Sequence, residues 1–316
     1  KRWLASDKLT DSERAELLSI ENDASTMALR FMAPMDFGTA GLRSTMYMGI
    51  GCMNRFTVAQ ATRGIAALVK AADGADRGVA IAYDSRNNSR VFAEVCAGVL
   101  AGAGIKVYIF DDLRPTPELS YAVRALNAMA GINITASHNP KEYNGYKAYW
   151  EDGAQISPEQ AKIVSAELSK FDVLDTDGIM DYAEGVKCGL ITVLGSDFDE
   201  QYLAAVLATA INPNAVREVA EDLKVVYTPI HGAGAKLVPE VFRRMGLKYL
   251  YTVDAQMAPD GNFPTVITPN PESAEALTMA IALAEKENAD LILVGGDMLT
   301  RSKDETDAVA VEFLKR

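Results

Sequence analysis

Histidine and cysteine are scarce in this sequence of 316 residues, which holds two of the first and three of the second. The cysteines, Cys52, Cys96 and Cys188, are scattered, odd in number and without the spacing of metal ligands. This usage is typical of a reducing compartment, and we expect a cytoplasmic location.

Long apolar runs are absent as well, since no stretch approaches the ~20 residues that a helix needs to span a bilayer. The opening stretch KRWLASDKLTDSERAELL is charged and helix-like, and it lacks the apolar core of a signal peptide.

Positive charge is in deficit, because 31 Lys and Arg against 43 Asp and Glu give a net charge of −12. Neither nucleic acid nor a membrane surface is therefore expected as a partner. Any phosphate-binding site must be a local positive pocket in an acidic body.

What the chain does contain is a repeated order of elements, over a length sufficient for about two domains. Short apolar runs that predict strands alternate with segments whose apolar residues recur at helical spacing. The first series is strand 79–83, a helix begun by Ser89 and ended by Gly102 and Gly104, strand 105–110, a helix near 118–126 and strand 129–134. The second series is strand 223–227, helix 235–246, strand 248–253, helix 273–288 and strand 289–294.

This repeat predicts two α/β domains of similar topology, each with a largely parallel sheet. Ligands of such sheets gather at the carboxyl ends of the strands. Outside the two series, residues 1–33 are predicted to be helical and residues 37–54 to form loops and a short strand. Residues 150–200 are predicted to form a closing helix and then a strand or linker.

Both histidines lie in loops that follow predicted strands, His138 in TASHNP (135–140) and His231 in TPIHGAG (228–234). A histidine in a loop of this kind is commonly a hydrogen-bonded structural residue. The comparable positions in the two repeats favour a role in a site. The sequence leaves both interpretations open.

Ser137 could be a hydrolase nucleophile, a carrier of a phosphoryl group or a turn residue. A hydrolase elbow needs small residues two positions before and after the serine, where this chain has Thr135 and Asn139. His138 is a poor base for its neighbour, because successive side chains tend to diverge. Serine hydrolysis is therefore not favoured.

A phosphorylated serine needs surrounding donors and positive charge rather than a triad. Asn139, Asn144 and Lys147 follow this serine within ten residues. Arg43 and Arg86 lie in other predicted loops that could converge on it. The pattern favours phosphoryl transfer.

The stretch GINITASHNPKEYNGYKAYWEDGAQ resembles the phosphoserine loop of the α-D-phosphohexomutases, the family of phosphoglucomutase and phosphomannomutase. The specific feature is Thr-Ala-Ser-His-Asn-Pro followed by Asn-Gly-Tyr-Lys. The resemblance covers nearly the whole chain up to about Val294, and FGTAGLR and HGAG are similar to the branch of phosphoglucomutases and phosphopentomutases. Other segments that resemble the family, in the same order, are FGTAGLR (37–43), NRFTVAQATRG (54–64), AYDSRNNS (82–89), TPIHGAG (228–234) and PDGNFP (259–264).

The resemblance implies an α/β fold with two of the family's four repeated α/β/α domains, built on mixed, largely parallel sheets. Residues 1–195 would form the domain with the phosphoserine loop and residues 196–303 the second domain. Residues 304–316 would begin a third domain or form a tail. The sequence does not indicate an oligomeric state.

The activity implied is that of an isomerase, which shifts phosphate between the 1- and 6-positions of a sugar through a phosphoserine and a bisphosphorylated intermediate. Glucose 1-phosphate and glucose 6-phosphate are the expected substrates, with Mg²⁺ and a glucose 1,6-bisphosphate-type activator. The alternatives are a phosphopentomutase acting on ribose phosphates and a non-catalytic relative that binds sugar phosphates. A nucleotide-binding protein is not favoured, because no GxGxxG follows a strand and no GxxxxGK[ST] occurs.

By the same resemblance, Ser137 would carry the transferable phosphate and, through it, contact the metal. Lys147 would serve as general acid and base, a role open to an ammonium that loses its proton when desolvated. Arg43 would hold the phosphoserine. His138 would handle protons or support the site.

Arg86 would support the serine loop and bind phosphate, and Asn139 and His231 would bind phosphate or substrate.

The family's magnesium loop, Asp-x-Asp-x-Asp-Arg, is missing, since DLILV is followed by GGDMLTRSKDETD. Asp297 and Arg301 remain from it, and Ser44 stands where the family more often has glycine. Three interpretations stay open: a sequence that joins two pieces across an omitted stretch, a fragment of a longer polypeptide, or a relative that has lost metal catalysis.

Overall fold

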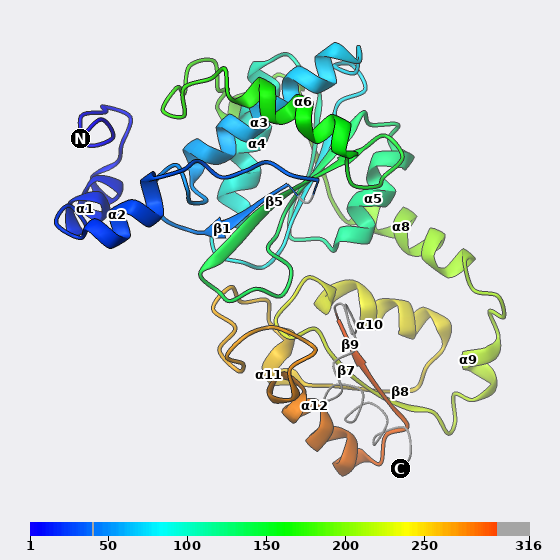
Figure 1. The fold of residues 1–316 in the computed structure, drawn as a ribbon. Helices are drawn as coiled ribbons and strands as arrows, with labels where there is room; N and C mark the ends of the chain where they lie inside the picture. The colour runs from blue at the N-terminus through cyan, green and yellow to red at the C-terminus, as the bar shows by residue number, and fades with distance from the viewer. Residues whose placement is uncertain (40, 296–316) are drawn as a thin grey trace. The chain divides into compact units, whose positions relative to one another are not determined.

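The structure is a computed structural model that describes residues 1–39 and 41–295. Asp297, Arg301 and the predicted segment 304–316 lie outside the described residues. The chain divides into two compact units (Figure 1). The first comprises Lys1–Asp84, Asn88–Ala136 and Glu142–Gly195, and the second comprises Ser85–Asn87, Ser137–Lys141 and the residues from Ser196 onward.

The first unit is built on a six-stranded sheet in the order β1-β5-β4-β2-β3-β6. Strands β4, β2, β3 and β6 run parallel, whereas β5 is antiparallel to both β4 and β1. This mixed, largely parallel sheet confirms the predicted fold class. The strands are β1 (Leu42–Thr45), β2 (Val79–Tyr83), β3 (Val107–Phe110), β4 (Ala130–Ile134), β5 (Tyr143–Trp150) and β6 (Ile191–Leu194).

Helices cover both faces of this sheet, which is why β2 and β4 are buried along their whole length and read as near-continuous apolar runs. Ile132 and Ile134 of β4 belong to the main core with residues of α3 and α4. The alternate residues of β4 face α5, because an added Cβ on Gly131 would meet Val123 and the Asn133 amide donates to Thr116. The helices are α3 (Arg55–Ala71), α4 (Ser89–Gly102), α5 (Thr116–Ala125) and α6 (Pro158–Leu168), which packs on α3.

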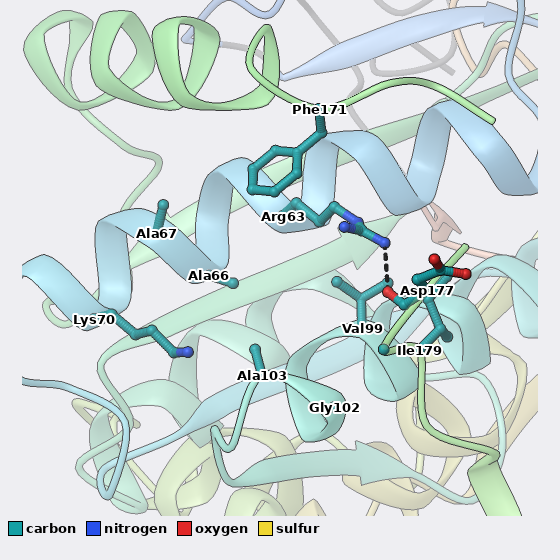
Figure 2. Close-up of a pocket in the computed structure, with 11 residues that line it drawn as sticks. Arg63, Ala66, Ala67, Lys70, Val99, Gly102, Ala103, Phe171, Asp177 and Ile179 are labelled. Atoms are coloured by element: carbon teal, nitrogen blue, oxygen red, sulfur yellow. Dashed lines mark hydrogen bonds between the residues drawn. The ribbon is translucent and has the colours of Figure 1, made fainter. Parts of the chain in front are cut away.

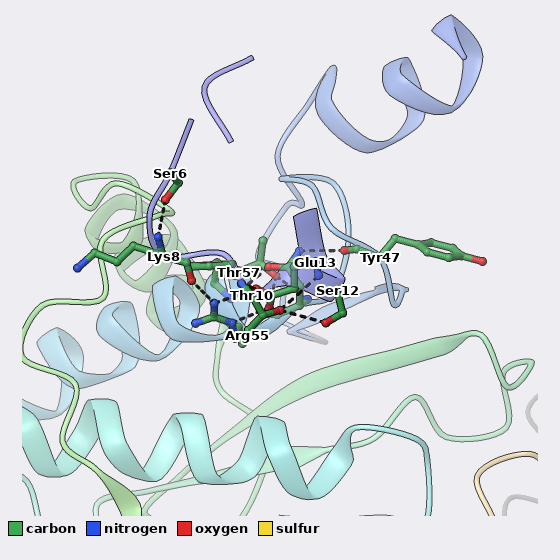
Figure 3. A network of polar contacts seen from close by, with 10 residues as sticks. Ser6, Lys8, Thr10, Ser12, Glu13, Tyr47, Arg55 and Thr57 are labelled. Atoms are coloured by element: carbon green, nitrogen blue, oxygen red, sulfur yellow. Dashed lines mark hydrogen bonds and ion pairs between the residues drawn. The ribbon is translucent and has the colours of Figure 1, made fainter. Parts of the chain in front are cut away.

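Two helices, α1 (Asp11–Ser19) and α2 (Ala24–Phe31), confirm the predicted helical start of the chain. Thr10 and Glu13 form a capping box that satisfies two backbone N–H groups at the start of α1. Arg55, at the start of α3, donates to both carboxylate oxygens of Glu13, at 2.7 and 2.9 Å (Figure 3). The N-terminal segment is thereby fastened to the first long helix of the unit.

The predicted closing helix and strand near residues 150–200 are also present. Helices α6 and α7 (Tyr182–Lys187) precede β6, which pairs in parallel with β3. Between α6 and α7 the chain lies directly on α4, where the Met180 N–H donates to the Gly98 carbonyl at 3.0 Å. An added Cβ on Gly102 would stand 1.8 Å from the Gly178 oxygen, so glycine is needed for this close approach.

The second unit holds a parallel three-stranded sheet in the order β8-β7-β9. The first strand of the series lies between the second and third, as β2 lies between β3 and β4 in the first unit, which confirms the predicted repeat. None of the helices in the described ranges has the length and apolar character that crossing a membrane requires. The elements are α8 (Ser196–Ala208), α9 (Ala215–Glu218), β7 (Lys224–Thr228), α10 (Gly234–Met245), β8 (Tyr249–Thr252), α11 (Asp254–Met257), α12 (Ala274–Glu287) and β9 (Leu291–Val294).

Candidate active site

Ser137 lies in the loop that leaves the carboxyl end of β4. Its side chain is exposed, whereas the preceding Ala136 is fully buried. The φ angle of Ser137 is 57°, in the left-handed region that residues with a side chain rarely adopt. Such a conformation costs on the order of 1 kcal/mol or more, so contacts around the loop must maintain it.

His138 lies nearer to the serine hydroxyl than the sequence predicts. The expectation that the two adjacent side chains diverge is wrong, because Ser137 Oγ and His138 Nδ1 are 3.4 Å apart. The left-handed backbone at Ser137 is the physical reason, since it departs from the extended or helical geometry on which that expectation rests. The separation exceeds the roughly 2.6–3.2 Å of an activated nucleophile and its base.

Arg86 holds the backbone of the serine loop. Its guanidinium donates to three carbonyl oxygens, those of Pro140 at 2.9 Å, Ser137 at 2.7 Å and Asn139 at 2.5 Å. The side chain is only 3% exposed. Planar, fixed donors of this kind suit a rigid support, and the three bonds account for how the loop keeps its left-handed turn.

The register of the sheet places Arg43 and Lys147 on one face. Arg43 of β1 lies opposite Gly145 of β5, and Lys147 lies two positions further along β5, opposite Asn133 of β4. Residues two apart in a strand point to the same face. The two cations are therefore diagonal neighbours, about 7–8 Å apart at their backbones, which long side chains can span.

Two glycines, each part of a sequence motif, allow the strands to approach closely at this point. An added Cβ on Gly145 would stand 2.5 Å from the Thr135 oxygen, and one on Gly41 would stand 1.8 Å from the Tyr146 oxygen. Gly41 also has a φ of 76°. The Thr135 N–H donates to the Gly145 carbonyl at 3.0 Å, so β5 is joined to the chain two residues before Ser137.

His231 has both ring nitrogens engaged inside the second unit. The side chain is 2% exposed, with Nδ1 2.8 Å from the Ala258 oxygen and Nε2 2.9 Å from Thr265 Oγ1. Because a carbonyl oxygen only accepts, Nδ1 donates in the first contact, while Nε2 is hydrogen-bonded to the threonine hydroxyl. Gln256 extends this buried network by donating to Thr265 at 3.1 Å. In this arrangement His231 stabilises its loop and presents no ring nitrogen to a ligand.

Carboxylates for a magnesium ion are not gathered within the ranges 1–39 and 41–295, where no group of three or more histidine, cysteine, aspartate or glutamate side chains could hold a metal. The described residues therefore do not fit a Mg²⁺ ion by themselves. Asp297, the carboxylate that remains from the family's metal loop, falls beyond residue 295.

A cavity of about 270 Å³ lies elsewhere in the first unit, between α3, α4 and the segment that follows α6 (Figure 2). Its lining includes Arg63, Lys70 and Phe171 around an alanine-rich floor. Arg63 is already paired with Asp175 at 3.0 Å. None of the predicted site residues lines this cavity.

Comparison with known proteins places these features in a family. A family model for the α/β/α domain I of phosphoglucomutase/phosphomannomutase matches residues 34–173. The model for domain II of the same family matches residues 200–296. Together the two models cover most of the chain, including the serine loop and both histidines.

Individual proteins show the same similarity. A phosphoglucomutase from Staphylococcus aureus strain N315 is 37% identical over 265 residues, which are 83% of this chain and 46% of that protein. The crystal structure of a putative phosphomannomutase from Thermus thermophilus has a TM-score of 0.70 and 26% identity, and the match covers 83% of this chain and 55% of that one. A phosphoglucomutase/phosphomannomutase family protein from Burkholderia thailandensis, with a TM-score of 0.61 and 23% identity over 80% of this chain and 50% of that one, shows the fold alone. The chain spans about half the length of the curated relatives it matches.

Proposed function

The chain belongs to the phosphoglucomutase/phosphomannomutase family, and we propose that it forms the phosphoserine half of a sugar-phosphate mutase. The proposed reaction is the interconversion of glucose 1-phosphate and glucose 6-phosphate. The observation that carries it is an exposed serine hydroxyl in a left-handed turn, held by Arg86 and preceded by a strand paired with the one that bears Lys147.

In the proposed chemistry the Ser137 oxygen attacks a phosphoryl group of a sugar bisphosphate. A bond between Ser137 Oγ and phosphorus forms as the bond between phosphorus and the sugar oxygen breaks. Lys147 takes the hydroxyl proton and returns it to the departing sugar oxygen, so the step is balanced. The reverse step delivers the phosphoryl group to the free hydroxyl of an incoming sugar monophosphate that carries its phosphate at the other position, which regenerates the bisphosphate.

The remaining side chains would have supporting roles. Arg43 would neutralise the phosphoserine, because a guanidinium binds phosphate oxygens in a fixed geometry. His138, at 3.4 Å from the serine oxygen, would donate to the phosphate or relay its proton. Asn139 would orient a phosphate oxygen, while Arg86 would act through the loop backbone rather than on the ligand.

Further parts of the proposal concern the whole protein. They are a cytoplasmic location, a first domain at 1–195 with a second at 196–303, a glucose 1,6-bisphosphate-type activator, and Mg²⁺ to offset phosphoryl charge. No step of the chemistry above is routed through the metal, because the described residues do not supply its ligands.

The test is ³²P transfer from labelled glucose 1,6-bisphosphate to the whole natural polypeptide in the presence of Mg²⁺. Label is expected on Ser137 in the wild-type protein and is expected to be lost in Ser137→Ala. Equal labelling of the two proteins would refute the assignment. Mutase assays on glucose 1-phosphate beside ribose 1-phosphate then separate the hexose activity from the pentose alternative. A protein that binds both without turnover would be the non-catalytic relative.

A further inference from the structure

Three hydrogen-bonded side chains, two of them buried and one partly buried, connect the end of β2 with α4 and β5 within the first unit. The Ser89 hydroxyl donates to Asp84 Oδ1 at 2.7 Å, and the Asn144 amide donates to the same hydroxyl at 3.0 Å. The Asn144 oxygen then accepts from the Gly145 N–H at 2.7 Å. Asn144 is 0% exposed and Ser89 is 1% exposed. We call these three side chains the Asp84–Ser89–Asn144 relay.

The proton order along the relay is fixed by its ends. A carboxylate only accepts, so the serine hydroxyl must give its one proton to Asp84 and accept from the amide of Asn144. Because Ser89 and Asn144 are buried, a reversed or broken bond between them would remove a hydrogen bond that water does not readily replace, which is costly. The relay therefore specifies one arrangement of the elements it joins.

Those elements are the ones that carry the proposed site. Asp84 extends the pairing of β2 with β4, where its N–H donates to the Ile134 oxygen at 3.1 Å, and it stands two residues before Arg86. Ser89 is the first residue of α4. Asn144 lies on β5, next to the residue opposite Arg43 and three before Lys147.

We propose that Asn144, acting through Ser89 and Asp84, is a positioning residue that fixes β5, and with it Lys147 and the paired β1 residue Arg43, against β2 and α4. This inference rests on the proposed function. It assigns the relay no contact with substrate. Its effect is on alignment, and misplacement of a reacting group by about 1 Å can cost on the order of a hundredfold in rate.

The test reverses the direction of the hydrogen bonds along the relay. Asn144→Asp keeps the shape and the acceptor for Gly145 but sets two carboxylates on one hydroxyl. The double variant Asp84→Asn/Asn144→Asp restores a donor at one end and an acceptor at the other, because the serine hydroxyl can turn around. Asn127→Asp is the matched control, since Asn127 is exposed before β4 and its side-chain oxygen accepts from Arg77 at 3.2 Å, as a carboxylate would.

Labelling of Ser137 by ³²P-glucose 1,6-bisphosphate is measured in the whole polypeptide as a maximal rate and a half-saturating concentration. We expect Asn144→Asp to lower the maximal rate about tenfold or more, with the half-saturating concentration within about threefold of wild type. The double variant is expected to recover to within about threefold, and the control to match wild type. Amide hydrogen exchange over β5 is expected to rise in the single variant and to fall again in the double variant.

The possible results are separable. An Asn144→Asp protein that labels as fast as wild type overturns the inference and leaves the proposed function standing. A double variant that regains exchange protection but stays slow also overturns it, since the relay would then serve stability alone. Absence of label from the wild-type protein refutes the proposed function, and the positioning role falls with it.

Discussion

At the scale of single residues, close backbone approaches explain why glycine is required where the family motifs have it. Gly41 combines a φ of 76° with an added-Cβ distance of 1.8 Å to the Tyr146 oxygen. Both partners are backbone, so neither can turn aside as a long side chain would. The FGTAGLR motif is therefore a packing requirement of β1 against β5, in addition to any part that Arg43 has in binding phosphate.

Three glycine-to-alanine variants separate the cost of a strained backbone φ angle from the cost of a steric clash with the added Cβ. Gly38→Ala is expected to be near neutral, because nothing lies within 4 Å of the added Cβ. Gly104→Ala, at a φ of 75° with open space around it, is expected to cost about 1 kcal/mol of unfolding free energy. Gly41→Ala is expected to cost roughly 3 kcal/mol or more, because collision adds to strain. Denaturant unfolding measures all three free energies. Equal costs at Gly104 and Gly41 would contradict the claim that close packing against the Tyr146 oxygen requires glycine at position 41.

At the scale of elements, strand β5 marks the limit of what periodicity could predict. The parallel strands were predictable, because runs such as VAIAY at Val79–Tyr83 are buried on both faces. Residues Tyr143–Trp150 instead contain Asn144-Gly145, a pair typical of turns. Here the asparagine donates a hydrogen bond to Ser89, and the glycine leaves room for the Thr135 oxygen, so tertiary contacts rather than a turn account for both residues.

The bond between the N-terminal helices and α3 gives a prediction that depends on pH. Burial disfavours the charged form of Glu13, but hydrogen bonds from Arg55 and Thr10 outweigh it and hold the pKa of the carboxyl below its ordinary 4.5. A lowered pKa in the folded state stabilises the protein above the unfolded-state pKa, and this contribution is lost as the pH falls through the folded-state value.

Glu13→Gln is therefore expected to lower the free energy of unfolding by about 0.5–1 kcal/mol near pH 7, after allowance for solvent screening. The difference from wild type is expected to shrink as the pH falls below about 4.5. Urea unfolding at several pH values measures it. Glu21→Gln, in an exposed part of the same segment, is the matched control. A constant difference at every pH would show that the ion pair is not its source.

At the scale of the whole molecule, two units repeat one strand order within a strongly acidic chain. The net charge of −12 repels phosphorylated ligands in general, so cations that bind phosphate must act locally. Arg43 and Lys147 on one sheet face provide such a local concentration. The overall negative charge thus disfavours a phosphorylated ligand, and its binding at the proposed site depends on short-range contacts with these two cations.

The three cysteines report how the first unit opens as a whole. Burial raises the pKa of the Cys96 thiol to about 12, and it also raises that of Cys52, whereas Cys188 is exposed. Iodoacetamide is expected to modify Cys188 at least a hundredfold faster than Cys96, on the order expected when the reaction must wait for unfolding. Peptide mapping over time checks this, and Cys188→Ser should remove the fast phase. Similar rates at the three thiols would mean that the unit opens readily.

The sequence by itself determined the parallel strands, the repeat and the serine loop. Strands buried on both faces are continuous apolar runs, and motifs have a fixed spacing, so both can be recognised from consecutive residues. Tertiary structure alone decided the pairing of β5, the approach of His138 to Ser137 and the occupied ring of His231. Each of these depends on a backbone angle or a partner far along the chain. Local patterns carry no information about such partners, since the contacts exist only once the sheet is assembled.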